Sequence, residues 1–265
     1  MSKVEAATGD VMGIMDGKVC VVTGGAGSIG LASASLLLRE GARVLLVGRT
    51  EDKLERAAAS LEAPSDRWAT CVADVASAEQ TRAYVALAVE LWGTIDVLFS
   101  HAGISGVISP VTEYPEDVFD TVLASNVRGT FLACKYALPH MNDGGSVIIT
   151  SSIMGVTADP GVSAYATSKH ALIGFARVLA KELAPRGIRV NVVAPGPIEN
   201  EFQSLIEERL TDILGENGTD VLNRAIPLGR HGQADEVART VLFLASEQST
   251  FSTGGVFMVD GGMHI

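Results

Sequence analysis

Seven short runs of apolar and β-branched residues recur along the chain, and segments with helical periodicity separate them. The helical spacing of apolar residues is clearest over residues 77–92 and 163–184. The seven runs are apolar almost throughout, as expected of strands that helices cover on both faces. Their alternation with helices predicts a parallel sheet with helices on both of its faces. The predicted strands are residues 18–23, 42–48, 67–73, 95–100, 145–151, 188–194 and 256–260.

The chain is predicted to fold as one domain. No linker rich in Pro, Gly or Ser, no charge run and no internal repeat divides it. We therefore predict a flexible tail over residues 1–16 and a single domain over residues 17–265. The least regular segment, residues 195–228, is amphipathic but interrupted and follows a predicted strand. Because ligands of open α/β sheets bind beyond the carboxyl ends of the strands, this segment is predicted to form a lid over a ligand site.

The composition narrows the classes of partner. Among the 265 residues, 47% are hydrophobic, and the formal net charge is -11 without any cluster of Lys and Arg. Nucleic acids and anionic membranes attract clustered basic residues, so the composition argues against both as partners. The apolar runs are also shorter than the roughly 18 residues that a membrane span requires. These features predict a globular protein with a large buried core.

Three cysteines, Cys20, Cys71 and Cys134, lie in apolar runs and match no metal-ligand spacing. Their odd count and their surroundings predict small core residues of a reducing compartment rather than disulfide partners or metal ligands. Residues 1–16 lack both an apolar segment and arginines, which argues against a signal peptide and a transit peptide. The sequence therefore predicts a cytoplasmic protein without a metal site.

The sequence Gly-Ala-Gly-Ser-Ile-Gly at residues 25–30 follows the first predicted strand and opens a predicted helix. In a G-x-G-x-x-G element the first glycine allows a tight turn, the second lets the backbone approach a pyrophosphate, and the third lets the helix pack on the strand. The amino end of the helix adds free N–H groups and a partial positive charge. No lysine follows the loop, as one would in a triphosphate-binding loop. The element therefore predicts a dinucleotide-binding domain.

The second predicted strand ends in Gly48 and Arg49, where NAD-binding units commonly place a carboxylate for the ribose 2'-hydroxyl. Gly48 offers no charge to repel a 2'-phosphate, and the guanidinium of Arg49 is a permanently charged donor suited to bind one. This pair favours NADP(H) over NAD(H). The alternative is a solvated arginine that opens a turn, because the glycine loop itself carries no second basic residue.

Tyr165 and Lys169 are four residues apart in a predicted helix and therefore lie on one of its faces. A tyrosine with the ordinary pKa of about 10 is a poor proton shuttle at neutral pH, whereas a nearby ammonium favours the phenolate. We expect Lys169 to lower the pKa of Tyr165 toward the operating pH. Ser152 lies at the end of the preceding predicted strand, where its hydroxyl can hydrogen-bond a substrate oxygen. The three side chains together indicate acid/base catalysis.

The segments TGGAGSIG, ADV, HAG, SNVRGTF, SVIITSS, YATSK, IRVNVVAPGPI and GGVFMVDGG occur in this order, and they resemble the motifs of the short-chain dehydrogenase/reductase family. The resemblance is to its single-domain branch and covers the chain from Asp16 to Met263. It implies a doubly wound, Rossmann-type α/β fold with a seven-stranded parallel sheet that binds NAD(P). It also implies hydride transfer between the nicotinamide and an alcohol or carbonyl carbon.

The resemblance assigns the catalytic roles to Asn126, Ser152, Tyr165 and Lys169. Tyr165 would exchange a proton with the substrate oxygen, which Ser152 would orient and polarise. Lys169 would hold the nicotinamide ribose and lower the pKa of Tyr165, and Asn126 would keep a water for the proton relay. Donors placed on this oxygen suit the alkoxide that develops during hydride transfer. The residues predicted to bind the cofactor are Gly24, Gly27, Ser28, Ile29, Gly30, Arg49, Asp74, Val75, Ala102, Gly103, Tyr165, Lys169, Pro195, Gly196 and Ile198.

Some of these positions carry alternatives or depart from the family pattern. Asp74 resembles the residue that binds the adenine amino group, or else caps the next helix, and Ile198 resembles a backbone contact to the carboxamide. Ser28 stands where the family usually has a glycine, so its hydroxyl would contact a phosphate or cap the helix. His101 replaces an asparagine and is expected to hydrogen-bond neighbouring strands, with a role near the cofactor as the alternative. Asn200 replaces a threonine that binds the carboxamide, and its amide can also donate and accept.

We predict an oxidoreductase that transfers a hydride between NADP(H) and a secondary alcohol or ketone of apolar or cyclic shape. The alternatives are a 3-oxoacyl thioester reductase and, more distantly, a non-catalytic protein that senses NADP(H); the short substrate region disfavours an epimerase or dehydratase. No clear Arg or Lys clamp for an acyl-carrier phosphopantetheine or a carboxylate is predicted, and the sequence does not place three arginines relative to the substrate: Arg128, Arg209 and Arg224. The carboxyl-terminal GGVFMVDGGMHI resembles family segments at subunit interfaces and implies a homotetramer. The predicted substrate walls are Ile104, Val107, Ile153, Met154, Pro197, Phe202, Leu205 and Ile206.

Overall fold

The computed structural model describes residues 13–265, so most of the predicted tail over residues 1–16 lies outside the described residues. Met15 is only 1% exposed and packs in a core cluster. Its backbone N–H donates to Glu40 O at 2.9 Å. The folded part of the chain therefore already includes residues before the predicted boundary at residue 17.

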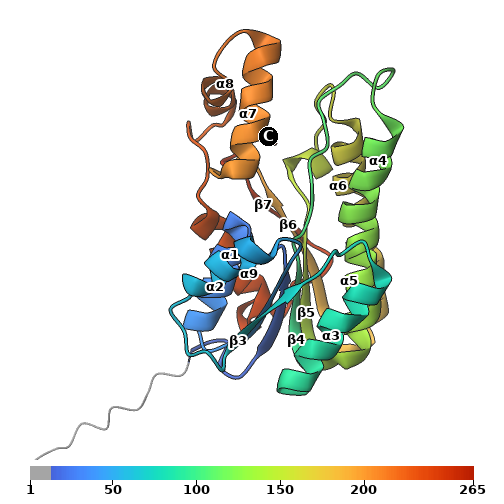
Figure 1. Cartoon of the computed structure of the whole chain (residues 1–265), viewed down its shortest axis with the longest axis vertical. Coiled ribbons are helices and arrows are strands. Elements are labelled where there is room, and N and C mark those ends of the chain that lie inside the picture. Colours follow the sequence, from blue (N-terminus) through green and yellow to red (C-terminus); the bar gives the residue numbers. More distant parts are fainter. Residues whose placement is uncertain (1–12) are drawn as a thin grey trace, which may run out of the picture.

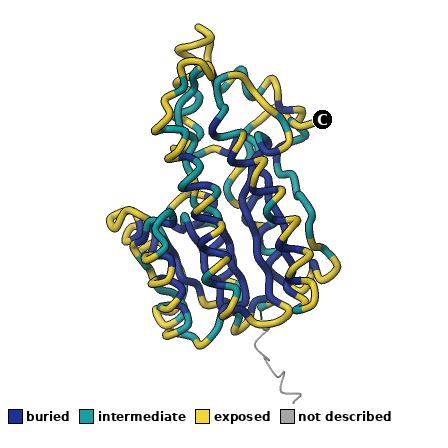
Figure 2. Tube along the Cα trace, turned by 90° about the vertical axis from the view of Figure 1, so that its right-hand side faces the viewer, coloured by how far each residue is buried: buried dark blue, intermediate teal, exposed yellow. Residues whose placement is uncertain are grey.

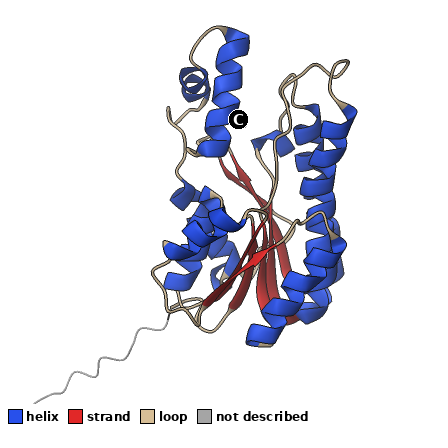
Figure 3. Cartoon of the chain, viewed as in Figure 1, coloured by secondary structure: helices blue, strands red, loops and turns tan. Residues whose placement is uncertain are grey.

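Seven parallel strands form one sheet in the order β3-β2-β1-β4-β5-β6-β7, seen as the central layer in Figure 3. The strand order reverses between β1 and β4, which is the switch point where open α/β sheets bind ligands. The predicted doubly wound, seven-stranded sheet is thus confirmed. The strands are β1 (Val19–Thr23), β2 (Arg43–Gly48), β3 (Trp68–Val72), β4 (Ile95–Ser100), β5 (Met141–Thr150), β6 (Arg189–Pro195) and β7 (Val256–Val259).

Helices cover both faces of the sheet, with α1, α2 and α9 on one side and α3, α5 and α6 on the other (Figure 1). Successive strand side chains point to opposite faces, so Val21 of β1 packs in one core cluster while Cys20 and Val22 pack in the other. Figure 2 shows that the buried residues follow the strands and the inner sides of the helices. The helices are α1 (Ser28–Arg39), α2 (Glu51–Ala59), α3 (Ala78–Trp92), α4 (Glu116–Leu123), α5 (Gly129–Ala137), α6 (Ser163–Leu183), α7 (Glu201–Leu214), α8 (Gly218–Ala225) and α9 (Ala234–Ala245).

Within the described residues, all three cysteines are free thiols. Cys20 and Cys134 are buried, as predicted, and burial raises the pKa of the Cys134 thiol to about 12. Cys71 departs from the core prediction because it is only half-buried. It lies on β3, which is the edge strand of the sheet and has a neighbouring strand on one side only.

Between β6 and α9 the chain rises above the sheet as two helices, α7 and α8, at the top of Figure 1. They lie within the segment 195–228 that was predicted as irregular, and both helices begin at an asparagine whose side chain caps the first turn. Asn200 Oδ1 accepts from Gln203 N at 2.9 Å, and Asn217 Oδ1 accepts from Asp220 N at 3.0 Å. We call α7, α8 and the turn between them the α7–α8 hairpin. In the described part of the chain, no helix combines the length and apolar character needed to cross a membrane.

Candidate active site

A cavity of about 1090 Å³ lies at the carboxyl ends of the strands. Residues that follow β1, β2, β4, β5 and β6 form its floor and sides, and the α7–α8 hairpin forms the wall above. The predicted cofactor-binding residues on its lining are Gly24, Gly27, Ser28, Ile29, Arg49, Ala102, Gly103, Tyr165, Lys169, Pro195, Gly196 and Ile198. The fold therefore brings residues from five separate strand ends, far apart in the sequence, into one site.

The glycine loop has the shape of a phosphate cradle. A Cβ atom on Gly30 would lie 2.2 Å from Gly24 O, so the close packing of α1 on the loop requires glycine there. A Cβ on Gly27 would meet only Gly24 O, at 3.4 Å, so the protein itself leaves room at this position, which lines the cavity. Gly27 caps α1 without a side-chain bond, leaving the first N–H groups of the helix open to the cavity. The residues present therefore fit a dinucleotide pyrophosphate.

Ser28 begins α1, is exposed and lines the cavity, and its hydroxyl makes no hydrogen bond within residues 13–265. It does not cap the helix, because Gly27 occupies the capping position. Capping of α1 is therefore excluded as a role for Ser28, and contact with a bound phosphate stays a prediction.

The cavity ends beside Gly48, Arg49, Thr50 and Lys53. Among the described residues Arg49 has neither an ion-pair partner nor a hydrogen-bonded one, so its guanidinium is available to a ligand. Lys53 was not predicted; its ammonium pairs with Glu201 of α7 at 3.0 Å in an exposed contact. A second basic residue in the first turn of the helix that follows Arg49 is the sequence signal that would have identified it.

Ser152, Tyr165 and Lys169 all line the cavity. Ser152 follows β5, and its Oγ accepts a hydrogen bond from Met154 N at 3.2 Å. Tyr165 and Lys169 project from the same face of α6, with Lys169 Nζ 5.4 Å from the centre of the tyrosine ring. Lys169 Nζ also donates to Thr150 O at 2.9 Å, a partner that the sequence analysis missed. The backbone carbonyl of Thr150 at the end of β5 thus holds the ammonium close to the tyrosine ring.

The pKa of Tyr165 differs from the sequence-based expectation. Burial raises the pKa of the phenol, and hydrogen bonding to Ser152 opposes this rise without reversing it. Burial also lowers the pKa of Lys169 to about 8. The expected lowering was for the pair beside a bound, cationic nicotinamide; in the protein alone, the loss of hydration by both groups dominates. The protonated phenol is therefore the favoured form of Tyr165 at neutral pH.

The lowered pKa of Lys169 predicts a pH-dependent stability. Below pH 8 the amine is protonated in both folded and unfolded chains, so folding carries the full cost of burying its charge. Between pH 8 and the ordinary value of 10.5 the folded chain has released the proton that the unfolded chain still binds, and stability rises by about 3 kcal/mol. We expect Lys169→Met to abolish this rise, measured as the difference in unfolding free energy from wild type across this range. The control is Lys181→Met on the exposed side of α6; an unchanged slope in Lys169→Met would contradict the assignment.

Asn126 lies in a π-helical turn, Ala124–Arg128, that joins α4 to α5. Its Oδ1 accepts from Ile104 N at 2.9 Å, and its Nδ2 donates to Ile104 O at 3.0 Å and to Ser168 Oγ at 2.9 Å. These bonds fasten the loop after β4 to α6 beside Lys169. Its predicted role toward a water stays a prediction; the contacts in the structure are those of a positioning residue.

His101 hydrogen-bonds a neighbouring strand, as expected: its Nδ1 lies 3.1 Å from Thr150 Oγ1 of β5. Burial, with the charge of Lys169 nearby, lowers the pKa of His101 to about 3, so the ring is neutral at physiological pH. The unpredicted Thr23 accepts from the N–H groups of His101 and Ala102 at 3.0 and 3.2 Å. Asn200 Oδ1 accepts the capping bond of α7, and its amide N–H groups remain available to donate to a carboxamide.

Some predicted residues do not line the cavity. Gly30 lies behind the loop, and Asp74 accepts from Ala76 N at 3.0 Å in a turn that precedes α3, while Ser77 caps that helix. Asp74 and Val75 therefore stay predictions as cofactor contacts. Among the predicted substrate walls, Ile104 and Leu205 are absent from the lining. Leu210, Ile213, Leu214, Val221 and Leu222 of the hairpin were missed, although several continue the helical spacing of Phe202 and Ile206.

The fold and the site together define an NAD(P)-dependent oxidoreductase, and comparison with known proteins agrees. A family profile described as Enoyl-(Acyl carrier protein) reductase matches residues 24–264. The chain is 37% identical over 253 residues to the 3-oxoacyl acyl-carrier-protein reductase of Thermotoga maritima, covering 95% of this chain and 99% of that one. It is 36% identical over 252 residues to the levodione reductase of Leifsonia aquatica, covering 92% and 93%.

Solved structures are similar over nearly the whole chain. A crystal structure of levodione reductase matches with a TM-score of 0.90 at 34% identity, covering 94% of this chain and 98% of that one. A blue fluorescent protein from a metagenomic library, in complex with NADPH, matches with a TM-score of 0.86 at 33% identity, covering 95% and 99%. The chain belongs to the short-chain dehydrogenase/reductase family, and it is an oxidoreductase that uses NAD(P).

Proposed function

We propose that this enzyme transfers a hydride between NADP(H) and a secondary alcohol or ketone with an apolar, compact or cyclic body. The observation that carries the proposal is the apolar wall that faces the reactive groups. Phe202 of α7 lies with its ring centre 6.3 Å from that of Tyr165. Ile206, Leu210 and Ile213 continue this wall along the same helix.

This wall supports an apolar substrate because the core does not cover it. No residue of α7 is buried, and Phe202 and Ile213 are exposed although they line the cavity. An apolar ligand that covers such side chains gains about 25 cal/mol for each Å² of apolar surface removed from water. A strongly hydrated substrate would gain nothing from the same contacts. A cyclic ketone offers a compact apolar surface next to a single reactive oxygen.

The catalytic residues suit the reduction of a carbonyl. When bound, the nicotinamide supplies the hydride to the carbonyl carbon, or accepts it in the reverse direction. Tyr165 Oη donates its proton to the carbonyl oxygen as negative charge develops there, and Ser152 Oγ donates a hydrogen bond to the same oxygen. The raised pKa of Tyr165 keeps this proton in place before the reaction. Lys169, held by Thr150 O, then stabilises the phenolate that remains.

The proposal is tested by a substrate panel with purified enzyme and NADPH. We expect methylcyclohexanone to be reduced with a kcat/KM at least about tenfold higher than that of dihydroxyacetone, since each methylene that the wall covers contributes about 0.8 kcal/mol. Consumption of NADPH and chromatography of the alcohol provide the readouts. Equal efficiency with the two ketones would argue against an apolar substrate.

The proposed preference for NADP(H) rests on the free guanidinium of Arg49. It lines the cavity beside Gly48, which carries no charge, whereas the nearby Lys53 is paired with Glu201. A guanidinium binds phosphate oxygens in a forked, charge-assisted geometry. The structural relative in complex with NADPH is consistent with this assignment.

Replacement of Arg49 tests this preference. We expect Arg49→Ala to weaken NADPH binding by about tenfold or more while leaving NADH binding within about twofold, because only the 2'-phosphate loses a charge-assisted partner. Dissociation constants from fluorescence titration provide the comparison. The matched control is Arg43→Ala, an exposed arginine at the opposite end of β2. Equal loss for both cofactors, or a large wild-type preference for NADH, would refute the role of Arg49.

A 3-oxoacyl thioester reductase is the second candidate, because the Thermotoga maritima relative carries that activity in its name and the family profile also names an acyl-carrier-protein substrate. Of the three arginines left unplaced by the sequence, Arg209 lines the cavity and donates to Gly106 O at 2.9 Å. Arg128 donates to Ala76 O, and Arg224 pairs with a glutamate of the hairpin at 2.7 Å. A higher kcat/KM for acetoacetyl-CoA than for methylcyclohexanone would favour this candidate. Absence of turnover with either would favour a binding protein that senses NADP(H).

We also propose that the enzyme is a cytoplasmic homotetramer. Phe251 and Ile265 expose nearly their whole side chains near the carboxyl end, where a partner subunit would cover them. The free thiols Cys20, Cys71 and Cys134 suit a reducing compartment. Light scattering of the purified protein gives the number of subunits.

A further inference from the structure

The α7–α8 hairpin stands over the cavity although almost no hydrophobic burial holds it there. Among its residues, α7 buries none and α8 buries only Gly218. Helices of globular proteins are normally held by a buried apolar face. The apolar face of α7 lines the cavity instead, so other contacts must hold the hairpin in place.

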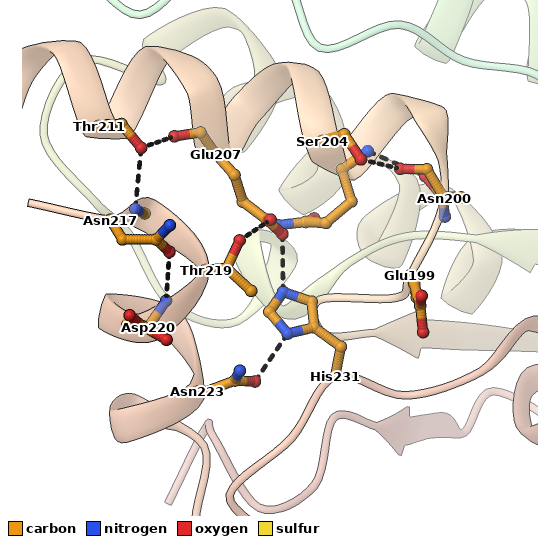
Figure 4. Close-up of polar contacts among 12 residues, drawn as sticks. Glu199, Asn200, Ser204, Glu207, Thr211, Asn217, Thr219, Asp220, Asn223 and His231 are labelled. Atoms are coloured by element: carbon orange, nitrogen blue, oxygen red, sulfur yellow. Dashed lines mark hydrogen bonds and ion pairs between the residues drawn. The ribbon is translucent and has the colours of Figure 1, made fainter.

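Polar contacts join the two helices of the hairpin (Figure 4). Thr219 Oγ1 of α8 donates to Glu207 Oε2 of α7, and the backbone N–H of Gly218 donates to Thr211 Oγ1 at 2.9 Å. The helices also approach closely, because a Cβ on Gly218 would lie 2.4 Å from Glu207 O. These contacts fix α8 against α7, with the Glu207 carboxylate between the two helices.

His231 connects this hairpin to the segment that precedes α9. Its Nε2 lies 2.8 Å from Glu207 Oε1, and its Nδ1 lies 2.8 Å from Asn223 Oδ1 of α8 (Figure 4). The side chains of His231 and Glu207 are only 9% and 14% exposed. Both ring nitrogens lie close to side-chain oxygens, Nδ1 to that of Asn223 and Nε2 to that of Glu207. Loss of one partner would leave a poorly hydrated polar group, which is costly.

The segment that carries His231 is itself fixed to the floor of the cavity. Gly232, the next residue, donates its N–H to Pro197 O at 3.0 Å and accepts from Glu199 N at 2.9 Å. Ile198 forms the matching isolated bridge and is buried on the cavity floor. The imidazole of His231 therefore links the hydrogen-bonded segment at the cavity floor to Glu207, in the middle of α7.

We propose that His231 and Glu207 are a positioning pair that holds the α7–α8 hairpin over the substrate. Their contact sets where Phe202 and Ile206 stand relative to Tyr165, and so determines how well the substrate is bound. The pair touches neither the glycine loop nor Arg49, so its loss should affect substrate binding more than cofactor binding. The proposal rests on the proposed function only in that an apolar ketone is the substrate that the hairpin covers.

The test compares Glu207→Gln and His231→Phe with wild-type enzyme. We expect the KM for methylcyclohexanone to rise about tenfold, equivalent to about 1.4 kcal/mol, with kcat within about threefold and the NADPH dissociation constant within about twofold. Hydrogen exchange of the NADPH-bound enzyme should accelerate in residues 201–228 and stay unchanged in the sheet. The matched control is Glu208→Gln, the neighbouring exposed carboxylate on α7, which should behave as wild type.

Thr219→Val is a milder variant for use if the others fold poorly, because it removes only one hydroxyl donor to Glu207. It should raise the KM for methylcyclohexanone by about threefold. The proposal is overturned if Glu207→Gln keeps the wild-type KM and the wild-type exchange of the hairpin. It is also overturned if exchange accelerates over the whole chain while kcat and cofactor binding fall together, since that marks a general loss of stability. Should the wild type reduce no ketone, the proposed function fails, and the exchange of residues 201–228 alone decides whether the pair holds the hairpin.

Discussion

Replacement of Tyr165 by phenylalanine is expected to lower kcat for ketone reduction by about 10²–10⁴-fold, the range that a positioned general acid supplies. The phenylalanine ring keeps the packing against Phe202 and the face that Lys169 approaches. NADPH binding should therefore stay close to that of wild type. Single-turnover measurements with saturating NADPH separate the loss of proton transfer from any loss of binding.

The control for this variant is Tyr136→Phe, which removes a hydroxyl that accepts from Arg82 at 3.1 Å on the surface, away from the cavity lining. It should retain full activity. Normal turnover in Tyr165→Phe would remove Tyr165 from the mechanism and show that another group supplies the proton. A parallel loss of NADPH affinity would show that the hydroxyl also contributes to the cofactor site.

Gly30→Ala is expected to be the most damaging change in the cofactor site that leaves every polar group in place. Its new methyl group would lie 2.2 Å from Gly24 O, so α1 must move away from the loop. We expect a loss of about 3 kcal/mol in the free energy of unfolding, as for severe overpacking, together with loss of NADPH binding. Urea unfolding and NADPH titration measure the two effects.

Gly27→Ala is the matched variant three residues earlier. Its methyl group would make an ordinary contact of 3.4 Å with Gly24 O and otherwise point into the cavity. We expect the unfolding free energy to change by less than about 0.5 kcal/mol, whereas NADPH affinity falls about tenfold or more because the methyl group occupies the place of the pyrophosphate. If both variants lose stability equally, the distinction between a packing glycine and a ligand-facing glycine is wrong.

The order of strands and helices was predictable because burial on both faces of a parallel sheet leaves an uninterrupted apolar run in each strand. The start of β5 was missed: it begins at Met141 rather than at residue 145, because Met141 pairs with Ile95 before a register shift. The glycine loop was predictable because its constraints are local to one turn. Cys71 was misjudged because an edge position depends on strand order, which no local pattern carries.

The candidate site also has features that the sequence predicts and features that depend on the folded chain. Ser152, Tyr165 and Lys169 were identified from spacing on one strand end and one helix face, and the structure brings all three to one cavity. The direction of the tyrosine pKa could not be obtained from that spacing, since it depends on how much water surrounds both groups. The support that Thr150 O lends to Lys169 was missed for a related reason: a backbone carbonyl carries no sequence signal.

The sequence by itself determined the fold class, the dinucleotide loop and the residues of the acid/base group, because each depends on periodicity or spacing within a single turn, strand or helix. Only the tertiary structure decided which of three arginines reaches the cavity, where the apolar wall stands, and that His231 meets Glu207. Those contacts join elements separated by many residues. Their formation depends on how the α7–α8 hairpin stands over the sheet, and that placement is a property of the folded chain as a whole.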